Sequence, residues 1–220
     1  MKVLFYILIF CTSTLLTGCF ELIKEVSLKR DGSGKIEVIV NFSQSKTSID
    51  VLLLLDEING HNIPSLDEID EKCSSLTDSI KSAPGLTNVN GIFNRDDYIF
   101  EFSCEFDKVE RLNECIYEFW KKKDQSEAKR ENYYAFNKNN FKQNFSARVA
   151  KLYLDMKPID REIFIGAEYV SIHRFEDQVV SQNNKRSIIA SSGNVVFMRE
   201  PMLQLILNPK FFNNIIKLKK

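Results

Sequence analysis

The feature that most constrains this chain is an N-terminal apolar run that is too short to span a membrane. Lys2 supplies a positive charge, and residues 3–16 are apolar apart from a few small polar side chains. A helix needs about 20 apolar residues to cross a hydrocarbon core about 30 Å thick. A run of 14 residues behind a basic residue is typical of a secretory signal instead. Only the residues after this run are therefore expected to build the fold.

The end of the run predicts how the chain is attached to a membrane. It resembles the lipobox of bacterial lipoproteins and consists of Leu16, Thr17, Gly18 and Cys19. The resemblance implies cleavage before Cys19, a diacylglycerol thioether on the Cys19 sulfur and usually an acyl chain on the new amino terminus. Each buried CH₂ contributes about 0.8 kcal/mol, so one chain binds only marginally whereas two or three anchor stably. The alternative is a membrane-retained signal that carries an incidental cysteine.

The lipobox resemblance divides the chain into a signal peptide, residues 1–18, and a single extracytoplasmic domain, residues 19–220. In other lipoproteins, retention in the inner membrane is associated with an Asp directly after the lipidated cysteine, and export to the surface with acidic runs. Residues 20–23 (FELI) resemble neither signal. The expected location is therefore the outer membrane facing the periplasm, in preference to the inner membrane or the cell surface.

The charges of the mature chain are balanced overall but unevenly distributed. Residues 19–220 carry a net charge of −1, which argues against a nucleic-acid partner. Residues 19–107 have a net charge of −9 and residues 108–220 a net charge of +8. Two complementary halves that pack together would explain this division. The alternative is a basic surface that faces anionic lipid, with its most concentrated parts at Lys121, Lys122, Lys123, Lys217, Lys219 and Lys220.

Three cysteines remain once the signal peptide is removed and Cys19 is lipidated. Cys73, Cys104 and Cys115 each belong to or border an apolar series, so all three are expected to face inward. In an oxidising compartment they form either three core thiols or one disulfide and a core thiol, because an odd number leaves at least one thiol over. No CxxC pair and no Cys/His spacing accompanies them, so no metal site is expected.

Turn signals and apolar periodicities predict an α+β domain with a mainly antiparallel sheet and helices packed on one face. The DGSG turn at residues 31–34 joins two alternating segments into a hairpin. Further strands are expected at residues 86–93 and 98–106, in a hairpin at 133–145, and in three segments between residues 167 and 200. Helices are expected at residues 45–60, 65–82 and 107–123.

Local signals also predict two helix starts and one pattern of burial. Ser65 with Glu68, and Asp107 with Glu110, have the spacing of a capping box. Residues 51–55 are apolar on every side of their helix, which predicts burial on more than one side.

Two parts of the sequence resemble lipoprotein domains of the mycobacterial LppM type. They are the strand–turn–strand unit around residues 31–34 and the later run from YVSIHRFEDQVVSQNN to NVVF. The resemblance covers about half of the chain. It implies a sheet-and-helix fold of a lipid-binding kind.

The sequence offers little catalytic chemistry. His61 is expected in a solvated loop and His173 as an ordinary strand residue. No GxSxG, HExxH, Walker or Rossmann pattern occurs. Carboxylates at residues 67–71 belong to a solvated helix face, and the set that could converge is Asp155, Asp160, Glu162 and Glu168. No enzymatic activity, metal or cofactor is therefore expected beyond the covalent lipid on Cys19.

Aromatic residues are numerous enough to suggest two uses. The 17 Phe, 7 Tyr and one Trp can fill a core between sheet and helices or line a pocket for an apolar ligand. The leading hypothesis is a lipid-anchored envelope protein with a non-catalytic domain that binds a partner, protein or lipid, or serves a structural role. A carrier of an apolar ligand or lipid is the alternative, and an uncharacterised envelope enzyme is the third.

Overall fold

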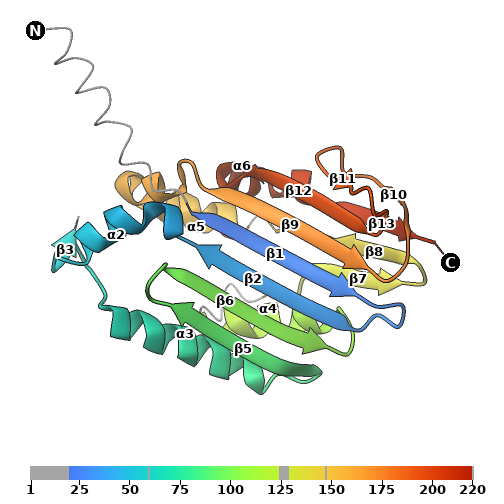
Figure 1. Cartoon of the computed structure of the whole chain (residues 1–220), viewed down its shortest axis with the longest axis horizontal. Coiled ribbons are helices and arrows are strands. Elements are labelled where there is room, and N and C mark those ends of the chain that lie inside the picture. Colours follow the sequence, from blue (N-terminus) through green and yellow to red (C-terminus); the bar gives the residue numbers. More distant parts are fainter. Residues whose placement is uncertain (1–19, 59, 124–128, 147, 220) are drawn as a thin grey trace, which may run out of the picture.

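Alternating strand sequences assemble into two packed sheets in the computed structural model, which describes residues 20–58, 60–123, 129–146 and 148–219 (Figure 1). The larger, seven-stranded sheet has the order β11-β12-β9-β1-β2-β6-β5. Its strands are β1 (Glu21–Leu28), β2 (Gly34–Asn41), β5 (Leu86–Asn94), β6 (Ile99–Phe106), β9 (Glu168–Phe175), β11 (Ile188–Ile189) and β12 (Val195–Pro201). The α+β fold class predicted from the sequence is confirmed.

A four-stranded sheet of order β10-β13-β8-β7 forms part of the second layer. It contains β7 (Tyr134–Asn137), β8 (Asn140–Gln143), β10 (Val179–Gln182) and β13 (Asn214–Leu218). A short hairpin is formed by β3 (Glu57–Ile58) and β4 (His61–Asn62). The helices are α2 (Lys46–Leu52), α3 (Leu66–Lys81), α4 (Arg111–Lys123), α5 (Arg148–Asp155) and α6 (Met202–Leu207), with 3-10 turns η1 (Ser43–Ser45), η2 (Pro158–Phe164) and η3 (Pro209–Phe212).

The first hairpin forms as its turn predicts, and it sits at the centre of the larger sheet. Asp31 Oδ1 accepts hydrogen bonds from the Ser33 amide at 2.9 Å and hydroxyl at 2.7 Å, and Gly32 takes the positive φ of 87° that the turn requires. On its other side β1 pairs in parallel with β9, whereas the remaining pairs in this sheet are antiparallel. The parallel pair brings together two strands that lie far apart in the sequence.

One face of the larger sheet carries the core. Successive strand residues point to opposite faces, so Val26 and Leu28 of β1 face the same side as Ile36 of β2 and Cys104 of β6. Side chains of α3, α4 and the smaller sheet pack into this same cluster. A second cluster beside it contains α6 and the C-terminal 3-10 turn, including the buried Phe212. The prediction of helices on one face is therefore confirmed.

The opposite face of the larger sheet is the one seen from the front in Figure 1, and it is rich in ion pairs. Arg174 Nε lies 2.6 Å from Glu25 Oε1, and Arg199 Nη2 lies 3.1 Å from Glu21 Oε1. In both pairs the arginine comes from the basic part of the sequence and the glutamate from the acidic part. Charge complementarity between the two parts is thus present within the sheet.

The prediction that residues 51–55 are buried is wrong. The helix α2 ends at Leu52, and the exposed fractions are 57% for Val51, 84% for Leu54 and 45% for Leu55. None of these side chains belongs to either core cluster. The physical reason is position: the segment extends beyond the end of β2 in Figure 1, where neither sheet provides a surface to pack against.

One of the two capping boxes is confirmed and the other is not. Ser65 Oγ accepts from the Glu68 amide at 3.2 Å, and Glu68 Oε2 accepts from the Ser65 amide at 2.8 Å. Helix α4 begins only at Arg111, because Glu110 Oε1 accepts instead from the Phe136 amide at 2.8 Å and Asp107 Oδ1 from Arg111 Nε at 3.0 Å. Glu110 thus makes a tertiary contact and Asp107 pairs within its own turn, in place of the expected cap.

Candidate functional site

A lysine occupies the core-facing side of the central strand β1. Lys24 stands in the alternating series between Leu22 and Val26, and only 9% of its surface is exposed. Pairing places it beside Ser171 of β9 and Val38 of β2. A charged group in such a position is unusual, because transfer of an ammonium from water to an apolar interior is costly.

Three aromatic rings surround the Lys24 amine. Its Nζ lies 5.0 Å from the ring centroid of Phe145, 5.3 Å from that of Tyr134 and 5.8 Å from that of Tyr169. These rings come from β7, from β9 and from the segment after β8, so the fold brings them together from distant parts of the chain. The ring faces stabilise the ammonium by cation–π attraction.

No carboxylate among the described residues pairs with Lys24, and its burial is not compensated by an opposite charge. Burial lowers the pKa of Lys24 from 10.5 to about 7. The amine is thus a mixture of charged and neutral forms near neutral pH. An anion placed next to it would favour the charged form.

The polar groups around Lys24 are neutral, and two of them lack a well-formed hydrogen bond among the described residues. His173 Nε2 is hydrogen-bonded to Gln143 Oε1, and burial, together with the nearby Lys24, lowers the pKa of His173 well below its usual value. Burial raises the pKa of Tyr169, whose hydroxyl stays protonated at neutral pH. Ser171 and Gln143 lie close enough to Tyr169 to oppose part of this rise in pKa, but within the described chain neither the Tyr169 nor the Ser171 hydroxyl makes a hydrogen bond of good geometry. Buried unsatisfied groups of this kind mark a site where a further polar partner can bind.

A cavity of about 260 Å³ adjoins Lys24, and we call it the aromatic pocket. The larger sheet contributes one wall, and α4, α5, α6 and the segment around β7 and β8 contribute the others. Most of its lining is apolar or aromatic, including Trp120, Tyr133, Phe145 and Leu205. Its charged lining residues in the described chain are Lys24 and Arg148.

Arg148 provides the second basic group of the aromatic pocket. Its guanidinium lies 4.9 Å from the Trp120 ring, and its Nη2 donates to Glu131 Oε1 at 2.9 Å. The side chain is 7% exposed, and its Nη1 has no hydrogen-bond partner among the described residues. The pocket therefore combines apolar walls with two basic side chains that retain capacity for an acceptor.

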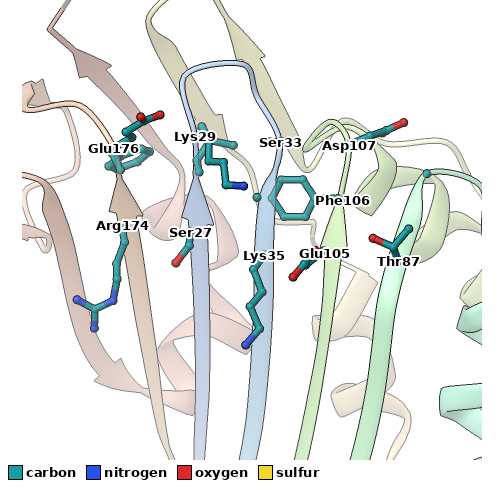
Figure 2. A pocket seen from close by; sticks show the side chains of 14 residues that line it. Ser27, Lys29, Ser33, Lys35, Thr87, Glu105, Phe106, Asp107, Arg174 and Glu176 are labelled. Carbon is teal, nitrogen blue, oxygen red and sulfur yellow. The ribbon is translucent and has the colours of Figure 1, made fainter.

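A larger concavity of about 540 Å³ lies at the other side of the sheet, and we call it the surface hollow (Figure 2). Lys35, Glu105 and Arg174 project into this region from neighbouring strands on one face. Two of its three basic side chains have acidic partners: Lys35 Nζ lies 2.7 Å from Glu37 Oε1, and Arg174 pairs with Glu25. The charges of Lys35 and Arg174 are thus paired within the described chain.

The structure places the residues singled out from the sequence as follows. Cys19 and the rest of the lipobox lie outside the described residues. Cys104 is buried, Cys73 and Cys115 are half-buried, and Cys73 and Cys104 are thiols rather than disulfide sulfurs. Burial raises the pKa of Cys104 to about 12, so this thiol is not activated.

The structure pairs one of the two histidines with a carboxylate and places the other in the core. His173 is buried in the core, while His61 is exposed and lies 3.2 Å from Asp160 Oδ2. Glu168 pairs with Arg199, and Asp67 and Asp70 bind Arg95 instead. Among the residues described, no three His, Cys, Asp or Glu side chains are grouped as metal ligands would be.

Sequence reasoning missed both basic residues of the aromatic pocket. The signal for Lys24 was present, because it falls on the apolar side of an otherwise alternating strand. Arg148 follows a polar, irregular segment and offers no such signal.

Comparisons with known proteins give limited information about this chain. No family model matches it, and no curated protein matches it. Among solved structures, the chain is similar to the NMR structure of the folded domain of LppM from Mycobacterium tuberculosis, with a TM-score of 0.40 and 12% sequence identity over 93% of each chain. None of the helices in the described part of the chain is long and apolar enough to cross a membrane.

Proposed function

We propose that this chain is a lipid-anchored envelope protein whose domain binds, without catalysis, an apolar ligand that carries an anionic group. The observation that supports this proposal is the buried Lys24 amine, which faces the aromatic pocket without a carboxylate partner in the described chain. The anchor is the diacylglycerol and acyl chain expected on Cys19 after removal of residues 1–18. The location that fits the residues after Cys19 is the outer membrane, facing the periplasm.

The chemistry of the pocket indicates the ligand's two parts. A carboxylate or phosphate oxygen beside Lys24 would offset the cost of burying the ammonium and give the Tyr169 and Ser171 hydroxyls an acceptor. The apolar walls would hold a hydrocarbon or ring. A volume of about 260 Å³ is below the roughly 300–1,000 Å³ of typical small-molecule pockets, so one short chain or chain end fits.

The aromatic pocket bears on the choice between a domain that binds a protein partner and a carrier of an apolar ligand. A protein partner needs an accessible surface, whereas the orphaned polar groups here are buried. A ligand small enough to enter the pocket can reach them. The carrier hypothesis is therefore the better supported of the two, and the enzyme hypothesis stays third, because the one imidazole near Lys24 is already hydrogen-bonded to Gln143.

Native mass spectrometry with lipid extraction tests the proposal. Residues 20–220 contain the complete core and would be purified without detergent. We expect a stoichiometric anionic amphiphile, or saturable binding of added decanoate. Either should be retained in Lys35→Met and weakened at least about tenfold in Lys24→Met. A protein that neither carries such a ligand nor binds decanoate would overturn the ligand proposal, as would equal binding by Lys24→Met.

The anchor needs a separate experiment. Cells fed a palmitate analogue should label the wild-type chain and leave Cys19→Ala unlabelled. Equal labelling of both chains would remove the anchor from the proposal and leave the pocket's role to the mass-spectrometric result.

A further inference from the structure

Exposed apolar side chains concentrate at one end of the molecule. Of the seventeen large apolar side chains that the described residues leave exposed, nine lie in two short segments, residues 51–58 and 154–165. We call these two segments the apolar end. Its most exposed members are Leu54 at 84%, Leu154 at 58% and Val51 at 57%. Single exposed apolar residues are common, but a concentration of them marks a contact surface.

The two segments lie together in space. His61 of the β3–β4 hairpin is 3.2 Å from Asp160 of η2, so the hairpin that follows α2 touches the turn that follows α5. Figure 1 shows α2, β3 and α5 gathered at the end of the larger sheet where β1 begins. The exposed side chains of both segments therefore belong to one end of the domain.

The first described residue fixes the position of this end relative to the anchor. The Phe20 ring packs against Phe42 at a centroid distance of 5.1 Å and against Phe164 of η2 at 5.9 Å. Cys19 directly precedes Phe20. One residue spans at most about 3.6 Å, so a lipid on Cys19 leaves no room for another protein between this end and the bilayer.

We propose that the apolar end lies on the membrane and inserts its exposed side chains, with Leu54 foremost, among the lipid headgroups and upper acyl chains. The proposal rests on the Cys19 anchor of the proposed function for its orientation. It also places α5, which carries the pocket residues Arg148 and Val149, beside the bilayer. A ligand from the membrane would then have a short path to the aromatic pocket.

The charge of the apolar end indicates what kind of lipid surface it meets. The two segments hold five carboxylates and two basic side chains, so anionic lipid would not attract them. Apolar insertion should therefore occur on zwitterionic vesicles and persist in high salt. The alternative basic surface includes Lys217 and Lys219, which are exposed at the C-terminal end of β13, across the molecule from the start of β1 in Figure 1.

Fluorescence on the acylated mature protein tests the orientation. A tryptophan would be introduced as Leu54→Trp or, as a matched control, as Ile188→Trp, since both positions are exposed apolar side chains. The protein would be reconstituted in phosphatidylcholine vesicles with brominated acyl chains. We expect a blue shift and strong quenching of the added emission for Leu54→Trp and neither for Ile188→Trp. Equal quenching at both positions, or none at position 54, would overturn the proposal.

A second measurement tests membrane binding by the apolar end without the lipid anchor. Residues 20–220, without Cys19, would be floated with phosphatidylcholine vesicles as wild type, as Leu54→Ser/Ile163→Ser and as the control Val180→Ser/Ile188→Ser. We expect the double substitution Leu54→Ser/Ile163→Ser to lower the partition coefficient between vesicles and water about tenfold, and the control to leave it unchanged. Failed palmitate labelling would overturn the anchor alone, whereas an unchanged partition coefficient would overturn the apolar end as the contact.

Two other outcomes would identify a different occupant and overturn the proposal. Association that requires anionic lipid and is lost in high salt would indicate the basic surface. A dimer in solution that Leu54→Ser/Ile163→Ser abolishes, without any vesicle binding by the wild type, would indicate a second copy of the chain.

Discussion

The aromatic pocket and the surface hollow are both lined by basic side chains from the central strands of one sheet: Lys24 of β1 in the pocket, and Lys35 of β2 and Arg174 of β9 in the hollow. The two sites differ in whether these charges have acidic partners. In the surface hollow, Lys35 and Arg174 lie on the solvated face, and each has a glutamate within 2.7 Å. In the aromatic pocket, Lys24 lies on the core face among three rings, with no carboxylate partner in the described chain. The hollow has about twice the volume, yet these two basic groups already have acidic partners.

This difference indicates that an unpaired buried charge is a better guide to a ligand site than the volume of a cavity. Exposed ion pairs contribute little and change little when one partner is removed. An ammonium held in an apolar interior destabilises the fold, and a ligand that neutralises it can recover part of that free energy on binding. Lys24 is therefore the more informative position at which to test the comparison.

The largest expected effect is a gain in stability on removing the buried charge. Lys24→Met should raise the free energy of unfolding by about 4 kcal/mol at pH 7, because the pKa of Lys24 falls from 10.5 to about 7 on folding. Urea titration of the ligand-free domain measures it. Lys35→Met should leave the midpoint nearly unchanged, and a Lys24→Met domain less stable than wild type would show that the amine has a stabilising partner.

The pH dependence of that gain should follow from the direction of the pKa shift. Between pH 7 and about 10 the unfolded chain keeps a proton on Lys24 that the folded chain has lost, so wild-type stability rises with pH by up to about 1.4 kcal/mol per unit. The advantage of Lys24→Met should shrink over this window and stay constant below it. Comparing the two chains cancels the titration of the buried tyrosines, which both retain. Loss of Lys24 also changes the pKa of His173, but burial, the larger cause, keeps that pKa below this window in both chains. A constant difference across the window would contradict the assigned pKa.

The two pockets also differ in how far the sequence predicts them. Turn chemistry and alternation are local signals, so the hairpin that carries Lys35 and the strands β5 and β6 were predicted correctly. The parallel pairing of β1 with β9 depends on residues far apart in the sequence, and no local pattern predicts it. The sequence shows Lys24 on the side of its strand that carries the apolar residues. Its aromatic neighbours come from three distant segments, which the sequence does not bring together.

The misjudged burial of residues 51–55 has a related cause. Local hydrophobicity says that a segment has apolar surface to cover, and it does not say whether the rest of the same chain covers it. Here neither sheet reaches that segment, and the same residues become the core of the proposed membrane contact. The lipobox prediction concerns residues outside those described, and it stays a prediction.

The next effect in size concerns ligand affinity in the aromatic pocket. Lys24→Met should weaken decanoate binding about 10- to 100-fold, because a hydrogen bond to a charged group contributes roughly 1.5–3 kcal/mol. Decanol, which has the same chain without the charge, should bind both chains similarly in isothermal titration calorimetry. Wild-type affinity for decanoate should also fall as pH rises above about 7, since the free amine then has to take up a proton. Loss of decanol binding in Lys24→Met would indicate a collapsed pocket instead.

The smallest expected effect belongs to Arg148, the second basic residue of the aromatic pocket. Only Nη1 of Arg148 lacks a partner among the described residues, while Nη2 already binds Glu131. Arg148→Lys keeps the charge but loses the planar group above Trp120, so decanoate affinity should fall only about two- to fivefold, because the guanidinium already has an acidic partner in Glu131. The matched change Arg174→Lys in the surface hollow should have no effect on decanoate. A loss at Arg148 as large as that at Lys24 would mean that the anion lies beside Arg148, with its apolar part directed toward Lys24.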